Sequence, residues 1–198
     1  MKPTMKAGCL LIRIEQCLEL FKVKTNLGGS YMSVEITKVY KQDVPALRFI
    51  GKKYGNSDRV DGMFGKYWGD WFENGWFDVI EKQTDKDLNS LYDDAGAYIG
   101  LMREENGEFE YWIGIFMPEG TTVPEGYNYL DFPKGALGVC WVHGKEEEIF
   151  CNEGMCGEKL ENAGYKLGDW CMERYCCPRY TTPDENGKIV LDICFYLK

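Results

Sequence analysis

The segment 170–176 combines residue types that can bind a cation or move a proton inside an apolar pocket. Strand alternation places Glu173 and Tyr175 on one face of this segment, together with Cys171. A carboxyl group among aromatic rings is poorly solvated, so its pKa rises and its attraction to a positive charge strengthens. Glu173 could therefore offset a ligand's charge, or act as a general base on water while Tyr175 donates to a leaving oxygen. Arg174 lies on the other face, where we expect it to be solvated.

Aromatic residues on other segments could stack on a flat ligand beside this carboxylate. The candidates are Trp68, Tyr98, Trp112, Phe116 and Trp141. Each ring that contacts a cation could contribute about 0.5–2 kcal/mol to binding. Tyr98 is also a second candidate donor for the hydrolytic chemistry. Tyr111, on the alternate face of its segment, is expected to pack in the core.

The nine cysteines and the single histidine form no recognisable metal or nucleophile motif. No C-x-x-C pair occurs. Cys151 and Cys156 lie five residues apart and Cys176 and Cys177 are adjacent, spacings that rarely converge on one zinc ion. No cysteine is locally paired with His143, which we expect to be structural or exposed. The odd cysteine count and the lack of an export signal favour free thiols. The sequence therefore predicts no metal and no cofactor.

An internal repeat indicates how the candidate residues are positioned. Residues 105–113 and 185–193 each begin with Glu-Asn-Gly and continue into a segment with strand-forming residues. Asn-Gly is a preferred pair for tight β-hairpin turns, so each turn is expected to join two antiparallel strands. Upstream, residues 44–51 and 132–139 each place a proline before an extended segment that leads into helix-like sequence. Both halves therefore read as strand, helix, strand, turn and strand.

Hydrophobic periodicity places one helix in each half. The first covers about 61–73 and is capped by Asn74-Gly75, and the second covers about 146–163 and is capped by Gly164. The expected strands cover the segments 34–40 with 46–53, 97–104, 108–117, 136–143, 170–176 and 188–197.

These elements predict an α+β fold made of two duplicated βαββ units. The halves are about 33–118 and 133–198, and 118–133 is the linker between them. Two such units related by a pseudo-two-fold axis would form one antiparallel sheet backed by two helices. A central ligand groove would lie on the axis.

Composition and charge narrow the possible functions. The chain has 198 residues, of which 44% are hydrophobic and 28% charged, so it can bury a core without disulfides or metal. Its formal net charge of −9 disfavours direct nucleic-acid binding. No apolar run approaches the ~18 residues of a membrane span. The apolar stretch 9–12 is too short for a signal peptide. We expect a cytoplasmic protein with no membrane or nucleic-acid partner.

Residues 1–31 lie outside the repeat and have two interpretations. Gly28-Gly29 can be encoded by a bacterial ribosome-binding sequence, and two codons separate this pair from Met32. Translation could therefore start at Met32, and 1–31 would then be a non-native leader. Alternatively, this extension forms a genuine N-terminal helix or strand. In both cases the domain itself covers 32–198.

The order of several short motifs resembles the GyrI-like small-molecule-binding family. The motifs are Pro45…Ile50-Gly51, Tyr98-Ile99-Gly100, Pro118-x-Gly120, Val123-Pro124-x-Gly126, Phe132-Pro133 and Trp170-x-x-Glu173-x-Tyr175. This family includes the effector-binding domains of BmrR and of AraC-type regulators such as Rob. The resemblance covers about 33–198. It depends on the order of the motifs and on the repeat, because each motif is common on its own.

The resemblance implies a duplicated βαββ fold whose central groove takes bulky, flat and often cationic compounds. An acidic residue at the floor of that groove corresponds to Glu173. Because 31 residues are too few for the helix-turn-helix domain of these regulators, we expect a free-standing module.

Three functions follow from the resemblance. The first is a small-molecule binder for drug sensing or sequestration. The second is a hydrolase of electrophilic, cyclopropane-bearing compounds that uses Glu173 and Tyr175. The third is an interaction protein, of the gyrase-inhibitor or transcription-regulator type, with an unspecified protein partner.

Overall fold

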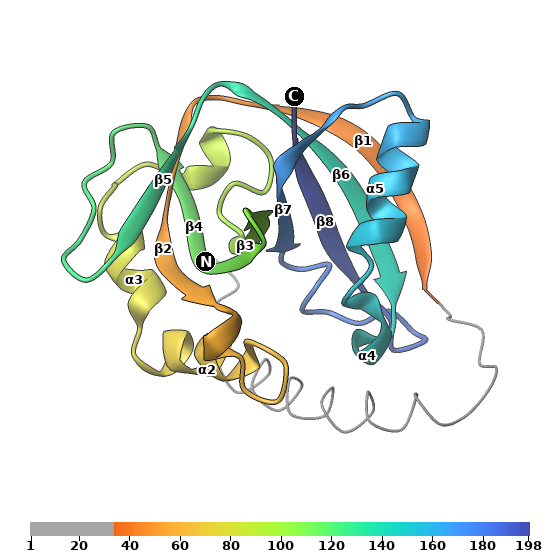
Figure 1. The fold of residues 1–198 in the computed structure, drawn as a ribbon, viewed down its shortest axis with the longest axis horizontal. Coiled ribbons are helices and arrows are strands. Elements are labelled where there is room, and N and C mark those ends of the chain that lie inside the picture. The colour runs from red at the N-terminus through yellow and green to blue at the C-terminus, as the bar shows by residue number, and fades with distance from the viewer. Residues whose placement is uncertain (1–33) are drawn as a thin grey trace.

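The strand segments pair into a single antiparallel sheet. The computed structural model describes residues 34–198, so the interpretations of 1–31 and of a start at Met32 lie outside the described residues. Eight strands form the sheet in the order β1-β6-β8-β7-β3-β4-β2-β5, and four α-helices accompany them (Figure 1). The predicted α+β class with an antiparallel sheet is confirmed.

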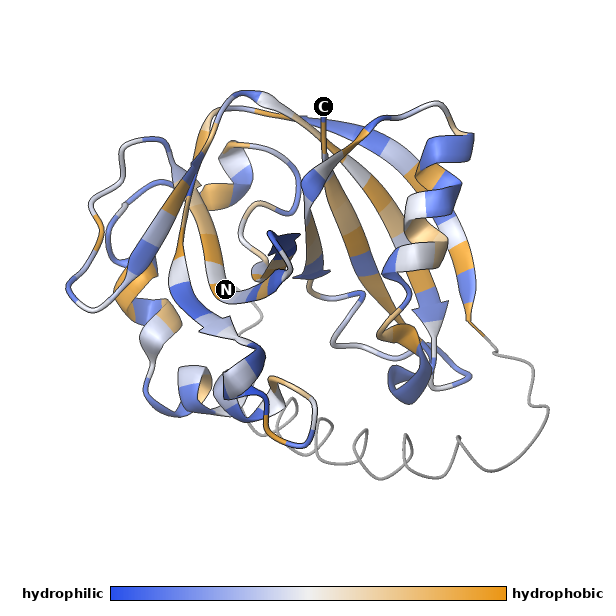
Figure 2. Ribbon diagram, in the orientation of Figure 1, coloured by the Kyte–Doolittle hydropathy of each residue, from blue (hydrophilic) through white to orange (hydrophobic). Residues whose placement is uncertain are grey.

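The strands agree closely with the segments that alternation predicts. They are β1 (Glu35–Val44), β2 (Leu47–Gly55), β3 (Tyr98–Glu105), β4 (Glu108–Pro118), β5 (Asn128–Phe132), β6 (Gly135–Gly144), β7 (Leu167–Tyr175) and β8 (Ile189–Leu197). Polar and apolar residues are interspersed along β1, whereas β8 is mainly apolar (Figure 2). The strand β5 is a correction, because this part of the chain was expected to be linker. It pairs with β2 and extends the sheet by one strand.

The two Asn-Gly turns behave differently. Asn106 and Gly107 have positive φ values of 54° and 80° and join β3 to β4 in a tight hairpin. The second turn, at Asn186-Gly187, lies inside the long connection between β7 and β8. There the Asp184 side chain accepts hydrogen bonds from the backbone N–H groups of Asn186 and Lys188. The expected second tight hairpin is therefore wrong, although β7 and β8 do pair.

Both predicted helices are shorter or more broken than expected. The first is α2 (Gly65–Glu73), which begins four residues late because Asp61 and Gly62 adopt left-handed turn conformations. It is followed by α3 (Trp76–Glu81). The second is divided into α4 (Glu146–Ile149) and α5 (Glu153–Asn162). The division occurs at Cys151, whose φ of 61° cannot continue a right-handed helix.

The strand order has a centre between β7 and β3. On one side of this centre the order is β7-β8-β6, and on the other it is β3-β4-β2, with β1 and β5 at the two edges. The two halves of the chain thus make corresponding trios of strands, while their duplication stays a prediction. Trp68, Cys156 and Leu160 anchor the helices to one face of the sheet. Across residues 34–198 no helix has both the length and the apolar character needed to span a bilayer.

Candidate functional site

A pocket opens above the centre of the sheet, where the two helical regions approach each other. It has a volume of about 260 Å³ and is lined almost entirely by apolar and aromatic side chains. The strands β3, β4 and β7 contribute its floor, and residues near the starts of α2 and α5 contribute its walls. Its lining residues are Arg59, Met63, Phe64, Gly65, Trp68, Met102, Phe109, Tyr111, Phe150, Cys151, Glu153, Glu173, Tyr175 and Tyr180.

Glu173 forms the polar centre of this pocket. Its side chain is buried, and its Oε2 atom accepts hydrogen bonds from the hydroxyl groups of Tyr175 (2.8 Å) and Tyr111 (3.1 Å). The indole Nε1–H of Trp68 donates in turn to the Tyr111 hydroxyl oxygen at 3.0 Å. This chain of donors orients both tyrosines toward the carboxylate. It also leaves Glu173 with neutral partners only, since no ion pair to it forms within residues 34–198.

The electrostatics of the pocket hold Glu173 near its point of ionisation. Burial raises the pKa of its carboxyl group to about 7, and the nearby Glu153 carboxylate adds to the rise. The hydrogen bonds from Tyr175 and Tyr111 oppose this effect only in part. Burial also raises the pKa of both tyrosines well above the usual value, so they remain hydroxyl donors near neutrality. A positive charge brought into the pocket would shift Glu173 to its ionised form.

A glycine on β3 makes room for this arrangement. The register places Gly100 opposite Glu173 on β7 and next to the Tyr111 side chain. A Cβ atom at this position would collide with the Tyr111 hydroxyl and lie 3.0 Å from Glu173 Oε2. The small residue of the Tyr98-Ile99-Gly100 motif therefore permits the contact between the two strands.

Stacked rings form the walls of the pocket. The Phe64 and Tyr111 rings are parallel within 3° and their centroids are 4.3 Å apart. Trp68 packs edge-on against Tyr175 at 4.7 Å, and Tyr180 contacts the same ring at 4.9 Å. These contacts fix the rings before any ligand arrives, so a flat compound would meet preformed surfaces.

Three of the residues proposed from the sequence meet in this pocket: Glu173, Tyr175 and Trp68. Tyr98 faces the same side of the sheet but is covered by α3. Its ring stacks on Phe77 with centroids 3.7 Å apart, and its hydroxyl donates to Glu81 at 3.3 Å. Tyr98 therefore does not line the pocket.

Trp112, Phe116 and Trp141 lie on the opposite face of the sheet. The register pairs Leu101 with both Trp112 and Met172, so Trp112 shares the face of Met172 and not that of Glu173. Trp112 and Phe116 both pack against Phe49, and Trp141 is approached by the side chains of Lys38 and Arg179. None of the three lines the pocket.

Tyr111 is the residue that sequence reasoning assigned to the core alone. It is buried, as expected, but its hydroxyl is also part of the pocket. Strand alternation separates Tyr111 from Trp112 without saying which of them faces the helices. Phe109 and Tyr111 lie on one face of β4, and these two aromatic residues could have indicated the face that lines the pocket. The face predicted from the sequence was instead the one that carries Trp112.

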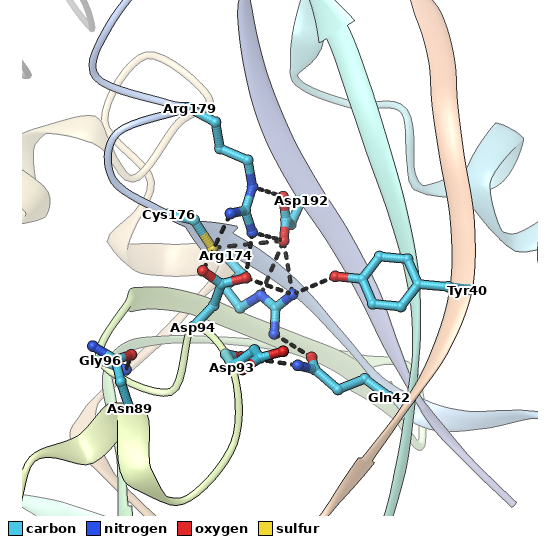
Figure 3. Close-up of polar contacts among 10 residues, drawn as sticks. All are labelled: Tyr40, Gln42, Asn89, Asp93, Asp94, Gly96, Arg174, Cys176, Arg179 and Asp192. Atoms are coloured by element: carbon cyan, nitrogen blue, oxygen red, sulfur yellow. Dashed lines mark hydrogen bonds and ion pairs between the residues drawn. The ribbon is translucent and has the colours of Figure 1, made fainter.

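The expectation that Arg174 is solvated is wrong. Arg174 and Asp192 are both completely buried, and an Arg174 Nη2–Asp192 Oδ2 distance of 2.7 Å joins them (Figure 3). Arg179 also binds Asp192, at 2.6 Å, and reaches Asp94 at the same distance. Gln42 on β1 accepts a further hydrogen bond from Arg174 at 2.7 Å. The alternation was correct, but a buried ionic network covers the face to which Arg174 belongs.

This network includes the one group of described residues whose donor atoms could converge on a metal. The side-chain ligand atoms of Asp94, Cys176 and Asp192 lie within 4.8 Å of one another. Both carboxylates are already engaged by arginines, which supply the positive charge that a metal ion would bring. The cluster fits an ion-pair network better than a metal centre. Among the described residues, Cys140, Cys156, Cys171, Cys176, Cys177 and Cys194 are free thiols, as expected.

Comparisons with known proteins bear on the fold. No family model and no curated protein sequence matches this chain. A solved structure of SAV2435 bound to tetraphenylphosphonium matches 82% of this chain and 94% of its own, with 15% identity and a TM-score of 0.59. A protein from Staphylococcus aureus MU50 assigned to bacterial transcription regulation matches 81% of this chain and 98% of its own, with 16% identity and a TM-score of 0.57.

A third structure is that of EcmrR in complex with DNA. It matches 96% of this chain and 66% of its own, with 14% identity and a TM-score of 0.51. At these identities the likeness establishes the fold. The antiparallel α+β architecture that the motifs suggested is the fold that this chain shares with these structures.

Proposed function

We propose that this chain is a GyrI-like protein that binds bulky, flat, cationic small molecules in the pocket above β3, β4 and β7. The observation that carries this proposal is the buried carboxyl group of Glu173, which has only neutral hydrogen-bond partners and is surrounded by aromatic rings. Ionising such a group costs free energy in the empty pocket. A cation from the ligand would offset that cost.

The walls of the pocket suit the same ligand. Aromatic faces attract a cation by about 0.5–2 kcal/mol each when water is excluded, without demanding one fixed geometry. Trp68 and Tyr175 can supply such faces. The similar structure solved with tetraphenylphosphonium supports this ligand class, because that compound is an aromatic cation. Drug sensing or sequestration would both use the pocket in this way.

The test is a titration of the full chain with a planar cationic dye, in which the fluorescence of Trp68 and the other tryptophans reports binding. We expect saturable micromolar binding that weakens tenfold or more, or ~1.4 kcal/mol, in Glu173→Gln. The exposed Glu158 on α5 offers a matched control, and Glu158→Gln should bind as the wild type does. Equal binding by wild type and Glu173→Gln would refute the role of Glu173. If no dye binds at all, the proposal fails and a protein partner becomes the better hypothesis.

A second candidate, hydrolysis of electrophilic compounds, is favoured by the state of Glu173. A carboxyl group with a pKa of about 7 can accept a proton from water near neutrality, and two tyrosine hydroxyls lie within 3.1 Å of it. The water oxygen would bond to the electrophilic carbon of a carbonyl-conjugated cyclopropane while Glu173 takes the water proton and the ring C–C bond breaks. The electron pair of that bond would pass to the ligand's carbonyl oxygen, to which Tyr175 donates a hydrogen bond, and the proton held by Glu173 would then return to the product.

The chemical identity of the ligand recovered after incubation distinguishes binding from hydrolysis. A bound dye should be recovered unchanged after incubation, whereas a hydrolase would convert a cyclopropane-bearing electrophile into its water adduct. Mass spectrometry of the recovered compound distinguishes the two. Conversion that persists in Glu173→Gln would contradict the proposed general base.

A further inference from the structure

One arginine stands at the pocket without a carboxylate partner. Residues 34–198 contain five arginines, and four of them form ion pairs with aspartate or glutamate: Arg48, Arg103, Arg174 and Arg179. The fifth, Arg59, lines the pocket and has no ion-pair partner among the described residues. The chain has nine more acidic than basic residues, so an arginine without a carboxylate partner is unexpected.

The guanidinium of Arg59 is held in a defined orientation. Its Cζ atom lies 4.6 Å from the centroid of the Phe64 ring and 4.7 Å from that of Phe109. Its Nε and Nη1 atoms donate to neutral oxygens, the Asn56 side chain at 3.0 Å and the Gly62 carbonyl at 2.9 Å. These contacts position the group without neutralising it. A planar, uncompensated guanidinium is well suited to bind a carboxylate or phosphate oxygen.

The lining of the pocket therefore contains groups of opposite charge. Glu173 on β7 and Glu153 on α5 provide carboxyl groups. Arg59, in the exposed segment that precedes α2, provides a guanidinium group. Apolar and aromatic side chains line the pocket around these groups. A ligand that satisfies all of these features has a flat apolar body, a cationic group and an acidic group.

We infer that the preferred ligands are zwitterionic, with a cationic group directed to Glu173 and a carboxylate or other anionic group bound by Arg59. This inference rests on the proposed function of the pocket and makes Arg59 a specificity-determining residue. A simple cation would bind through Glu173 alone. A zwitterion of the same shape would use both Glu173 and Arg59.

A rhodamine with a free carboxylate and its methyl ester form a suitable pair of probes. They share one cationic ring system and differ only in the anionic group. Fluorescence anisotropy at about pH 8 would give the dissociation constant of each dye for the full chain. We expect the ratio of ester to acid dissociation constants to fall tenfold or more in Arg59→Gln, with little change in the affinity for the ester. Arg59→Lys should keep part of the preference, because it retains the charge but not the planar group.

Lys66 provides the matched control. It is an exposed cation on α2, next to the pocket but not in its lining, so Lys66→Gln removes the same charge without removing the contact. An equal loss of preference in Lys66→Gln would show a long-range charge effect and overturn the role of Arg59. If both dyes bind and the ratio is the same in wild type and Arg59→Gln, the inference is wrong while the proposed function stands. If neither dye binds the wild type, the proposed function itself has failed.

Discussion

Glu173 shows how folding changes the chemistry of a single residue. In the unfolded chain its carboxyl group is solvated, with the ordinary pKa of 4.5, whereas burial raises the pKa to about 7 in the folded protein. The folded state therefore binds the proton more tightly than the unfolded state does. Between these two pKa values, Glu173 makes the protein more stable at the acidic end and less stable as the pH rises. Burying the Glu173 carboxyl group thus reduces the stability of the protein above the ordinary pKa of this group.

Replacing Glu173 by glutamine should remove this pH dependence. Glutamine has the shape of the glutamate side chain and an oxygen that can accept hydrogen bonds from Tyr111 and Tyr175, but it carries no charge. We expect Glu173→Gln to equal the wild type in stability near pH 4.5 and to exceed it by about 3 kcal/mol near pH 8. Urea unfolding at both pH values measures the difference. Glu158→Gln, on the surface of α5, should show no such divergence from the wild type. A constant difference between Glu173→Gln and wild type at both pH values would contradict the assignment.

At the scale of elements, β7 connects two separate structures. Its alternation directs Glu173 to the face covered by helices and Arg174 to the opposite face. On that opposite face, Arg174 joins β7 to β8 through its ion pair with Asp192 and to β1 through its hydrogen bond to Gln42 (Figure 3). Arg179, which follows β7 in the chain, joins the same network, and the next residue, Tyr180, is a wall of the pocket. The ionic network therefore holds in place the strand and the loop that shape the pocket.

Removing the acid at the centre of this network should destabilise the protein strongly. Asp192→Asn leaves Arg174 buried without its principal counter-charge, and breaking a buried pair of this kind costs about 3–5 kcal/mol. Asp131→Asn is the matched control, because Asp131 pairs with Arg48 at the protein surface, where such pairs contribute about 1 kcal/mol or less. Thermal and urea unfolding of both variants would compare the two losses. A similar small loss in both would mean that the buried network is not a main source of stability.

At the scale of the whole molecule, the strand order creates the pocket and the net negative charge produces an electrostatic field around it. The order brings β7 beside β3, so residues from the two halves of the described chain meet at the centre of the sheet. One helical region from each half flanks this centre, α2 with α3 on one side and α4 with α5 on the other (Figure 1), and residues near α2 and α5 line the pocket. The formal charge of −9 produces a long-range field that attracts cations toward the molecule.

This field should affect the rate at which a cationic dye binds more than the rate at which it leaves. Salt screens charges separated by more than about 10 Å at 0.1 M ionic strength, so long-range attraction weakens while contacts inside the pocket persist. We expect the association rate constant to fall several-fold between low and high salt, with a dissociation rate constant that changes less than about twofold. Stopped-flow fluorescence measures both. A neutral dye of the same shape should show no salt dependence of association, and an equal dependence for the two dyes would argue against steering.

The sequence by itself determined most of the strands and which residues share a face within each strand. Alternation and turn chemistry are local properties, so β3, β4 and their Asn106-Gly107 hairpin could be predicted from neighbouring residues alone. The same alternation correctly separated Glu173 and Tyr175 from Arg174. The broken helix at Cys151 and the strand β5 were missed, because neither has a strong local signal.

Only the tertiary structure decided which face of each strand the helices cover. A strand with apolar residues on both faces, such as β4, offers two equivalent choices, and packing against α2 selects Tyr111 over Trp112. Packing likewise placed Trp141 with the ionic network and buried Tyr98 under α3. Pairing between distant strands then brought Gly100, Tyr111 and Glu173 together. These outcomes depend on contacts between residues far apart in the chain, which local patterns cannot specify.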